Sequence, residues 1–468
     1  MSRHLEVFQE PQRIASPFSL FRSRAARLVG PALIVLALAV HLFVVWTIAR
    51  EPLDVSGQPG ESQRSIIWSL FNDSVHRPGP GADLLAVYHA GLALQHGSSL
   101  YADTAVDEGF VYFPFRYLPV VGWALGGFLI QFPPLLAYRI WVLVLEGALG
   151  SFLLVFGLRS SGWLRYVGIC VLLLSAPYFL EVYMGQFTFL TVGLVLIGLL
   201  LQEGPPARKA GAIWANTATY VTAVLLKLFP IVTAPAFIRK KQYWLPLCLA
   251  ILLGLAVSLP YFLAQPGELR LFYSKNFGYG GGLDSGNYSL VYLAYLCAKS
   301  FEPNMLVAHW DVVASLWRVL ILGLTSLAVF FNRRNQVAVG AVTMLLAHFL
   351  SYSDVWEHHM SAVLVVGVVL LWLIQRERPH DRPLLAWTVA CLVLLALPTP
   401  FALLDPLKNP TVWDPLDGAP MAARLLLVAV KALPTGLLYL IALTLLGKAG
   451  YSFNVFQAGT KTHLPASS

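Results

Sequence analysis

Charge is scarce in this chain of 468 residues. Asp, Glu, Lys and Arg together make up 12% of it, whereas soluble domains average about 25%. Hydrophobic residues account for 57%. This composition excludes an ordinary soluble enzyme and predicts an integral membrane protein.

Cysteines and common catalytic motifs are scarce as well. Three of the four cysteines lie in apolar runs, where a thiol behaves as a small hydrophobic side chain, so we predict no disulfide framework. No P-loop, HExxH or GxSxG motif stands in a supporting context, and no His and Cys cluster has zinc spacing. We therefore expect neither a metal nor a cofactor. No internal repeat is evident.

Long apolar runs are abundant, and a helix needs about 20 such residues to cross a bilayer. The clearest runs are Leu28–Ala49, Tyr243–Ala264, Val312–Phe331, Pro383–Leu404 and Leu425–Leu446. Further helices are expected over Phe115–Ile130, Tyr138–Leu158, Leu164–Tyr178, Phe187–Leu201, Ile213–Ile238 and Ala362–Ile374. The pattern predicts an all-α polytopic membrane protein. We expect about ten to thirteen helices in one transmembrane domain, residues 28–447.

Basic residues gather in short clusters at the ends of apolar runs. The clusters are Arg22, Arg24 and Arg27; Arg239, Lys240 and Lys241; Arg333 and Arg334; and Arg376 and Arg378. The positive-inside rule places them in the cytoplasm, together with a basic tail at residues 1–27. The net charge of +8 therefore indicates contact with anionic lipid and not with nucleic acid. Residues 448–468 form a C-terminal tail, and the first apolar run reads as a retained anchor.

Simple alternation of the helices conflicts with this rule in the middle of the chain. It places Arg159, Arg165, Arg208 and Lys209 outside. Their placement in the cytoplasm requires broken or re-entrant segments near residues 114–134 and 227–230, which are allowed where backbone lines the protein interior.

Four polar segments are expected on the extracytoplasmic side: residues 50–114, 265–311, 351–359 and 405–420. In the first, Asp83–Gly97 predicts a helix in the membrane interface, because Leu84, Leu85, Tyr88 and Leu92 share one face. The carboxylate of Asp83 could serve there as a general base on a hydroxyl group. The alternative is that Asp83 only caps the helix.

Several other polar residues could carry chemistry. Lys227 lies in an apolar run just before Pro230, where it could meet a lipid phosphate or snorkel to the interface. His358 and His359 could contact a phosphate or hydroxyl, or be ordinary interfacial side chains. Arg116 could bind phosphate, pair with a first-loop carboxylate or simply lie in the interface. Lys431 could extend its charged end to the membrane interface, and Glu146 is interpreted as a structural residue.

Six short motifs occur in a characteristic order along the chain. They are Asp83-Leu-Leu-Ala-Val-Tyr88, His96-Gly-Ser-Ser-Leu-Tyr101, Tyr112-Phe-Pro-Phe-Arg-Tyr-Leu-Pro119, Met184-Gly-Gln186, Leu226-Lys-Leu-Phe-Pro230 and Trp356-Glu-His-His359. Over residues 30–375 this order resembles the GT-C glycosyltransferases, specifically glycosyltransferase family 87, whose members are mannosyltransferases that use polyprenol-phosphate-mannose. Members commonly have Asn or Asp and Pro before the tyrosine that matches Tyr101, and here Ser98-Ser-Leu precedes it.

The resemblance implies a GT-C bundle of helices with a long first extracytoplasmic loop that carries interfacial helices. It implies a hexosyltransferase in a bacterial plasma membrane. The enzyme would move a sugar, expected to be mannose, from a polyprenyl phosphate to a hydroxyl of a lipid-linked or cell-envelope acceptor. The configuration at the anomeric carbon would be inverted. Asp83 would be the general base. The donor phosphate would meet Lys227, His358, His359 and Arg116. The substrate cavity would include Tyr88, Tyr101, Tyr112, Gln186, Trp356 and Glu357.

Two other classes of function remain open. A transporter or flippase of lipid-linked saccharides would need charged or discontinuous helices near the midplane, preferably in two related halves. No such pairing is evident in the sequence. A non-catalytic membrane scaffold would need neither Lys227 nor the first-loop carboxylates.

Overall fold

The computed structural model describes residues 24–53, 80–101, 114–203, 209–277, 287–301, 305–332, 336–399 and 420–448. Every regular element within these ranges is a helix. This confirms the predicted all-α class. Tyr112, most of the first loop and most of residues 405–420 lie outside the described residues.

Six helices are long and apolar enough to cross a membrane. They are α1 (Arg24–Arg50), α5 (Pro134–Arg159), α11 (Trp244–Ala264), α15 (Trp310–Phe330), α17 (Met360–Glu377) and α19 (Met421–Lys448). A seventh span is possible if α6 (Gly162–Leu173) and α7 (Ala176–Met184), which meet at a bend of 40°, are taken together. These counts concern the described residues only.

Shorter apolar helices complete the bundle. They are α8 (Thr188–Gln202), α9 (Lys209–Leu226), α13 (Leu290–Ser300), α16 (Val337–Ser351) and α18 (Arg382–Ala396). The prediction of ten to thirteen spans counted most of these segments, but none reaches the length of a full crossing. Neighbouring elements cover most of α8 and α16, so these two helices need not span the hydrocarbon core alone.

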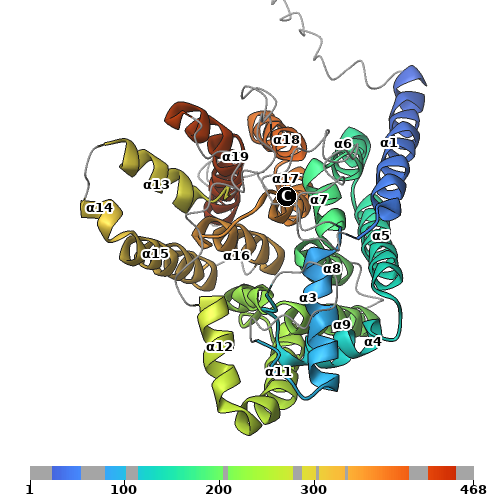
Figure 1. The fold of residues 1–468 in the computed structure, drawn as a ribbon. Coiled ribbons are helices and arrows are strands. Elements are labelled where there is room, and N and C mark those ends of the chain that lie inside the picture. Colours follow the sequence, from blue (N-terminus) through green and yellow to red (C-terminus); the bar gives the residue numbers. More distant parts are fainter. Residues whose placement is uncertain are drawn as a thin grey trace, which may run out of the picture.

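Burial divides the helices into an inner and an outer set. The apolar stretch of α17 is buried along its whole length, whereas α1, α11 and α15 expose most of theirs. Figure 1 shows α17 near the middle of the bundle, with α1 and α15 towards its edges. The exposed leucines of the outer helices would be unfavourable in water, and they form the surface expected to face lipid.

The prediction that residues 115–130 form a membrane span is wrong. This segment is irregular up to Leu118, then forms a π-helical stretch, η3 (Val121–Gly126), and a short α4 (Gly127–Leu129). The π-helix packs against α3 (Ala82–Gln95). Because prolines interrupt the run at both ends, it lies on the bundle as a broken segment.

The second expected break is also present. The run Ile213–Ile238 divides after α9 into a 3₁₀ turn, η5 (Phe229–Thr233), and a short α10 (Ala234–Phe237). The polar segment 265–311 is more ordered than predicted, because it contains α12 (Pro266–Phe277), α13 and α14 (Met305–Ala308).

The helix predicted at Asp83–Gly97 exists as α3, but it is not amphipathic. Ten of its fourteen residues are buried, on all sides of the helix. It packs against η3, α5 and α7. The apolar side chains that predicted an interfacial face are thus part of the protein core.

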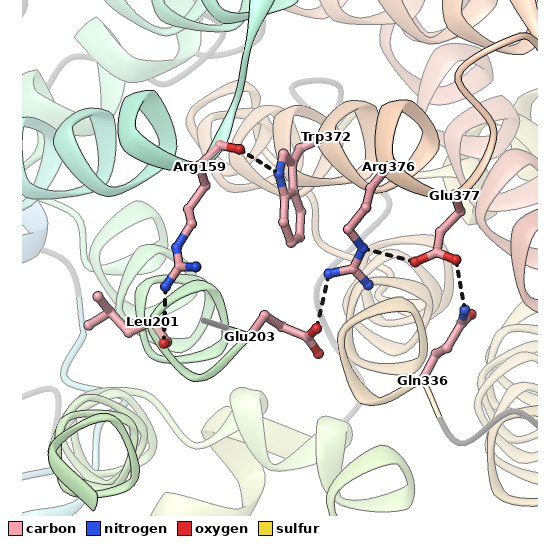
Figure 2. Close-up of polar contacts among 7 residues, drawn as sticks. All are labelled: Arg159, Leu201, Glu203, Gln336, Trp372, Arg376 and Glu377. Atoms are coloured by element: carbon pink, nitrogen blue, oxygen red, sulfur yellow. Dashed lines mark hydrogen bonds and ion pairs between the residues drawn. The ribbon is translucent and has the colours of Figure 1, made fainter. Parts of the chain in front are cut away.

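Two basic residues, Arg159 of α5 and Arg376 of α17, lie near each other at one end of the bundle (Figure 2). Arg376 pairs with Glu203 at 2.9 Å and with Glu377 at 2.8 Å. The indole of Trp372 donates to the carbonyl of Arg159 at 3.1 Å. Arg159 therefore lies at the same end as Arg376, as the positive-inside rule requires and simple alternation does not.

The basic cluster that begins at Arg239 lies at this end too. The guanidinium of Arg239 donates to the carbonyl of Val329 at 3.2 Å, in the last turn of α15. Further along the chain, the side chain of Asn332 donates to the carbonyl of Leu446, and that of Gln336 donates to the carboxylate of Glu377. We call this side of the bundle, defined by Arg159, Arg239 and Arg376, the basic end. Helices α8 and α17 start at the opposite end.

Candidate active site

Asp83 lies at the opposite end, in the first turn of α3. The N-cap of this helix is Gly81, in a left-handed conformation with φ 82°. Its N–H donates to the carbonyl of Tyr183 at 2.7 Å, which ties the start of α3 to the end of α7. The alternative that Asp83 is the cap is therefore wrong, and its carboxylate is available at a helix N-terminus, where negative charge is favoured.

Gly185 makes this close approach possible. It ends α7 with φ 67°, and a Cβ there would lie 2.9 Å from the Cβ of Leu84. Such a distance is shorter than side chains tolerate, so only glycine lets α3 lie this close to the junction of α7 and α8. The next residue, Gln186, gives a side-chain hydrogen bond to Asp83.

Lys227 reaches the same junction from the break after α9. Its ammonium donates to Oε1 of Gln186 at 3.2 Å and to the hydroxyl of Thr188 at 2.7 Å. Gln186 thus presents its carbonyl to Lys227 and its amide N–H to Asp83. Lys227 is partly buried in the protein and does not snorkel to the interface.

Opposing influences set the pKa of Asp83. Burial raises this pKa from 3.8 to about 7, while the charges of Lys227 and Arg116 and the hydrogen bond from Gln186 lower it. A carboxylate with such a pKa is half ionised near neutral pH. It can therefore accept a proton from a hydroxyl group more readily than an ordinary aspartate.

The Trp-Glu-His-His motif adjoins this group. Trp356 packs with Ala82 and Met184, the neighbours of Asp83 and Gly185. The motif forms a single turn, η7 (Glu357–His359), at the start of α17. Three sequence motifs far apart in the chain are therefore brought together at one place.

The two histidines of this turn differ in their bonding. The backbone N–H of Trp356 donates to Nδ1 of His359 at 3.0 Å. His358 is 4% exposed, and neither of its ring nitrogens has a hydrogen-bond partner among the described residues. A buried imidazole without a partner is uncommon and indicates a ligand or water that is bound in use.

Arg116 faces the same segment, and its charge also acts on Asp83. It pairs with Asp354 at 3.5 Å, and its side chain is 52% exposed. Such an exposed pair contributes little stability. The guanidinium can therefore turn to an anionic ligand at small cost.

Three of the residues predicted to line the substrate cavity make internal contacts instead. The hydroxyl of Tyr88 donates to the carbonyl of Phe132 at 3.0 Å, and that of Tyr101 to the carbonyl of Tyr117 at 2.7 Å. The carboxylate of Glu357 contacts Lys431. Tyr112 lies outside the described residues.

Glu181 is a site residue that the sequence interpretation missed. It is fully buried, and its carboxylate accepts from the N–H of Phe189 at 2.8 Å and from the hydroxyl of Ser361 at 3.1 Å. It also interacts electrostatically with Lys227 and Asp83. The available signal was an acidic residue in an apolar run, which indicates a functional position.

Two other charged residues of the helices have partners inside the bundle. Glu146 accepts from the hydroxyl of Tyr178 at 3.0 Å and contacts His41 at 2.9 Å, as the structural interpretation expected. Lys431 is fully buried and does not snorkel. Among the described residues, no three His, Cys, Asp or Glu side chains are grouped as metal ligands.

A family model, glycosyltransferase family 87, matches residues 110–353, somewhat more than half of the chain. The chain belongs to glycosyltransferase family 87. The segment that matches family 87 contains Arg116, Gln186 and Lys227, whereas Asp83 and His358 lie on either side of it. The resemblance on which the sequence interpretation rested is confirmed.

Other comparisons are more distant. No curated protein matches the family 87 chain. Among solved structures it is similar to ArnT from Cupriavidus metallidurans in the apo state, at 17% identity and a TM-score of 0.42. That match covers 92% of this chain and 78% of the other. Family membership and the apolar helices together make this protein a membrane glycosyltransferase.

Proposed function

We propose that this glycosyltransferase moves a hexose, with mannose the first candidate, from a polyprenyl phosphate to a hydroxyl of a lipid-linked or cell-envelope acceptor. The observation that carries the proposal is the bridge through Gln186, which joins the carboxylate of Asp83 to the ammonium of Lys227. A proton acceptor and a cation that can bind a phosphate are thus neighbours at the end of the bundle away from the basic clusters.

The reaction needs both groups at once. Asp83 takes the proton of the acceptor hydroxyl, and the oxygen attacks the anomeric carbon from the face opposite the phosphate. The bond from the anomeric carbon to the phosphate oxygen breaks, and the electron pair leaves with the polyprenyl phosphate. The transition state resembles an oxocarbenium ion, and attack from the opposite face inverts the configuration.

The leaving phosphate gathers negative charge as that bond breaks. Lys227 and the imidazole of His358, which has no hydrogen-bond partner among the described residues, are the first candidates to stabilise it, with His359 and Arg116 as further candidates. Preorganised donors of this kind are the largest single contribution to many enzymatic rates. They cost no rearrangement during the reaction, because Gln186 and Thr188 already hold the ammonium.

The positive-inside rule gives the orientation. The basic end faces the cytoplasm, so the site faces the extracytoplasmic side of the membrane. A bacterial plasma membrane would supply a polyprenyl-phosphate donor there, and the outer helices would supply the lipid-facing route to the site.

Replacement of Asp83 tests the proposal most directly. We expect Asp83→Asn to reduce transfer at least ~100-fold, because the general base is lost, while expression and folding persist. The assay uses detergent-solubilised protein, radiolabelled polyprenyl-phosphate-mannose and membrane lipid as acceptor. Asp311→Asn, at an exposed position in α15, is the matched control and should keep full activity.

Retained transfer by Asp83→Asn would refute the base assignment. Donor translocation without any glycosylated product would indicate a flippase instead.

A further inference from the structure

Lys431 stands out because it is a fully buried cation in the middle of the last helix. Its ammonium lies 3.3 Å from the carboxylate of Glu357, and the two side chains are 0% and 1% exposed. It also donates to the carbonyls of Leu395 and Leu397 at the end of α18. One side chain thus joins α18, α19 and the turn η7.

Glu357 is held on its other side as well. The same carboxylate oxygen accepts from the backbone N–H of Thr399 at 2.9 Å. Glu357 begins the single turn that carries His358. Because both contacts are buried, the turn cannot rotate without separating Glu357 from its cation.

His358 has no comparable tether of its own. Both its ring nitrogens are without a hydrogen-bond partner among the described residues. Packing and the backbone of the turn alone therefore decide where the imidazole points. The neighbouring residue, Glu357, is the one whose side chain anchors that backbone to the C-terminal helices.

A buried ion pair is a poor way to add stability, since desolvation offsets much of the attraction and apolar replacements are often neutral or better. The ion pair between Lys431 and Glu357 is better explained if it holds a functional turn in one defined conformation. We infer that Lys431 is a positioning residue, which acts through Glu357 to fix the turn that presents His358 to the phosphate of the lipid-linked donor. This inference rests on the proposed function.

The test must separate positioning from folding. Lys431→Met alone leaves Glu357 as an unpaired buried charge and risks misfolding. The informative variant is therefore Lys431→Met with Glu357→Gln, which is neutral and keeps an oxygen for the N–H of Thr399. Thr388→Val is the control, because it removes a buried hydrogen bond within α18 that does not involve the turn.

We expect the double variant to fold and to raise the KM for the lipid-linked donor about tenfold, which corresponds to about 1.4 kcal/mol, with the KM for the acceptor unchanged. Adding His358→Ala should raise the donor KM no further, because both changes remove the same contact. Additive effects, or equal rises in both KM values, would overturn the inference. Thr388→Val should change neither value.

A second measurement does not depend on the donor. Acylation of His358 by diethylpyrocarbonate, followed by mass spectrometry, should be several-fold faster in the double variant, because the turn is no longer fixed. Unchanged acylation at His358 would overturn the positioning role. If His358→Ala by itself leaves the donor KM unchanged, the donor-phosphate role in the proposed function fails, and the acylation rate still decides whether Lys431 positions the turn.

Discussion

At Asp83, the surroundings place two opposite demands on one carboxylate. Burial disfavours its charge, and Lys227, Arg116 and Gln186 favour it, with a resulting pKa of about 7. Sequence alone singled out the residue as a candidate base. It could not show the balance, because the partners come from positions 116, 186 and 227 and meet only in the folded chain.

This balance predicts the pH dependence of the reaction. In the proposed mechanism the ionised form of Asp83 is the base, so kcat/KM should rise with pH and level off above about 7, falling about tenfold for each pH unit below that value. Initial rates between pH 5 and pH 9 with saturating acceptor would measure it. A profile that is flat below pH 7 would contradict the assignment.

The same pKa predicts an effect on stability. A carboxyl group whose pKa is raised by folding binds its proton more tightly in the native state, so stability is lost as pH rises from about 4 to about 7. Asp83→Asn removes this loss. We expect its thermal midpoint to exceed that of the wild type at pH 8 and to match it near pH 4. A lower midpoint at pH 8 would show that Asp83 is stabilising when charged.

At the scale of elements, the contact between α3 and η3 depends on the absence of side chains. A Cβ on Gly126 would lie 2.5 Å from the carbonyl oxygen of Val87, whereas a Cβ on Gly127 would meet nothing within 4 Å. Backbone atoms cannot withdraw as a flexible side chain can, so any larger residue at 126 must move α3.

Two adjacent substitutions test this contact. Gly126→Ala should lower the thermal midpoint and reduce transfer, because α3 carries Asp83 at its start. Gly127→Ala should be neutral or slightly stabilising, since alanine favours a helix more than glycine does. Fluorescence-detected thermal unfolding and the transfer assay would measure both. Equal effects of the two variants would argue against close packing at residue 126.

The elements also show where sequence patterns misled. The spacing of Leu84, Leu85, Tyr88 and Leu92 is that of an amphipathic helix, yet most of α3 is buried on every side. A small residue such as Gly91 looks neutral in such a pattern. It lets η3 approach another face of α3, because a Cβ at residue 91 would lie 2.5 Å from the backbone of Gly126. No local pattern reveals that contact.

For the whole molecule, the two ends differ in charge and in role. Arg159, Arg239 and Arg376 lie at one end, and Asp83, Lys227 and His358 lie at the other. The broken segments η3 and η5 change the direction of the chain in ways that counting spans does not anticipate. They remove the conflict between helix parity and the positive-inside rule.

This arrangement predicts opposite accessibility for single cysteines at the two ends. In a background without Cys170, Cys248, Cys297 and Cys391, Ser98→Cys should react with an impermeant maleimide in intact cells. His380→Cys, in the turn after α17, should react only after permeabilisation. Both positions are exposed. The reverse pattern would place the site in the cytoplasm.

By itself, the sequence determined the class of protein, the approximate position of most apolar helices and the order of the motifs. These follow from composition and local hydrophobicity, which the bilayer selects directly. Only the tertiary structure decided that Gly185 brings Asp83 to Gln186 and Lys227, that Glu357 faces Lys431, and that α3 is part of the core. Each of these depends on contacts between residues far apart in the chain, and packing forms such contacts only when the whole bundle folds.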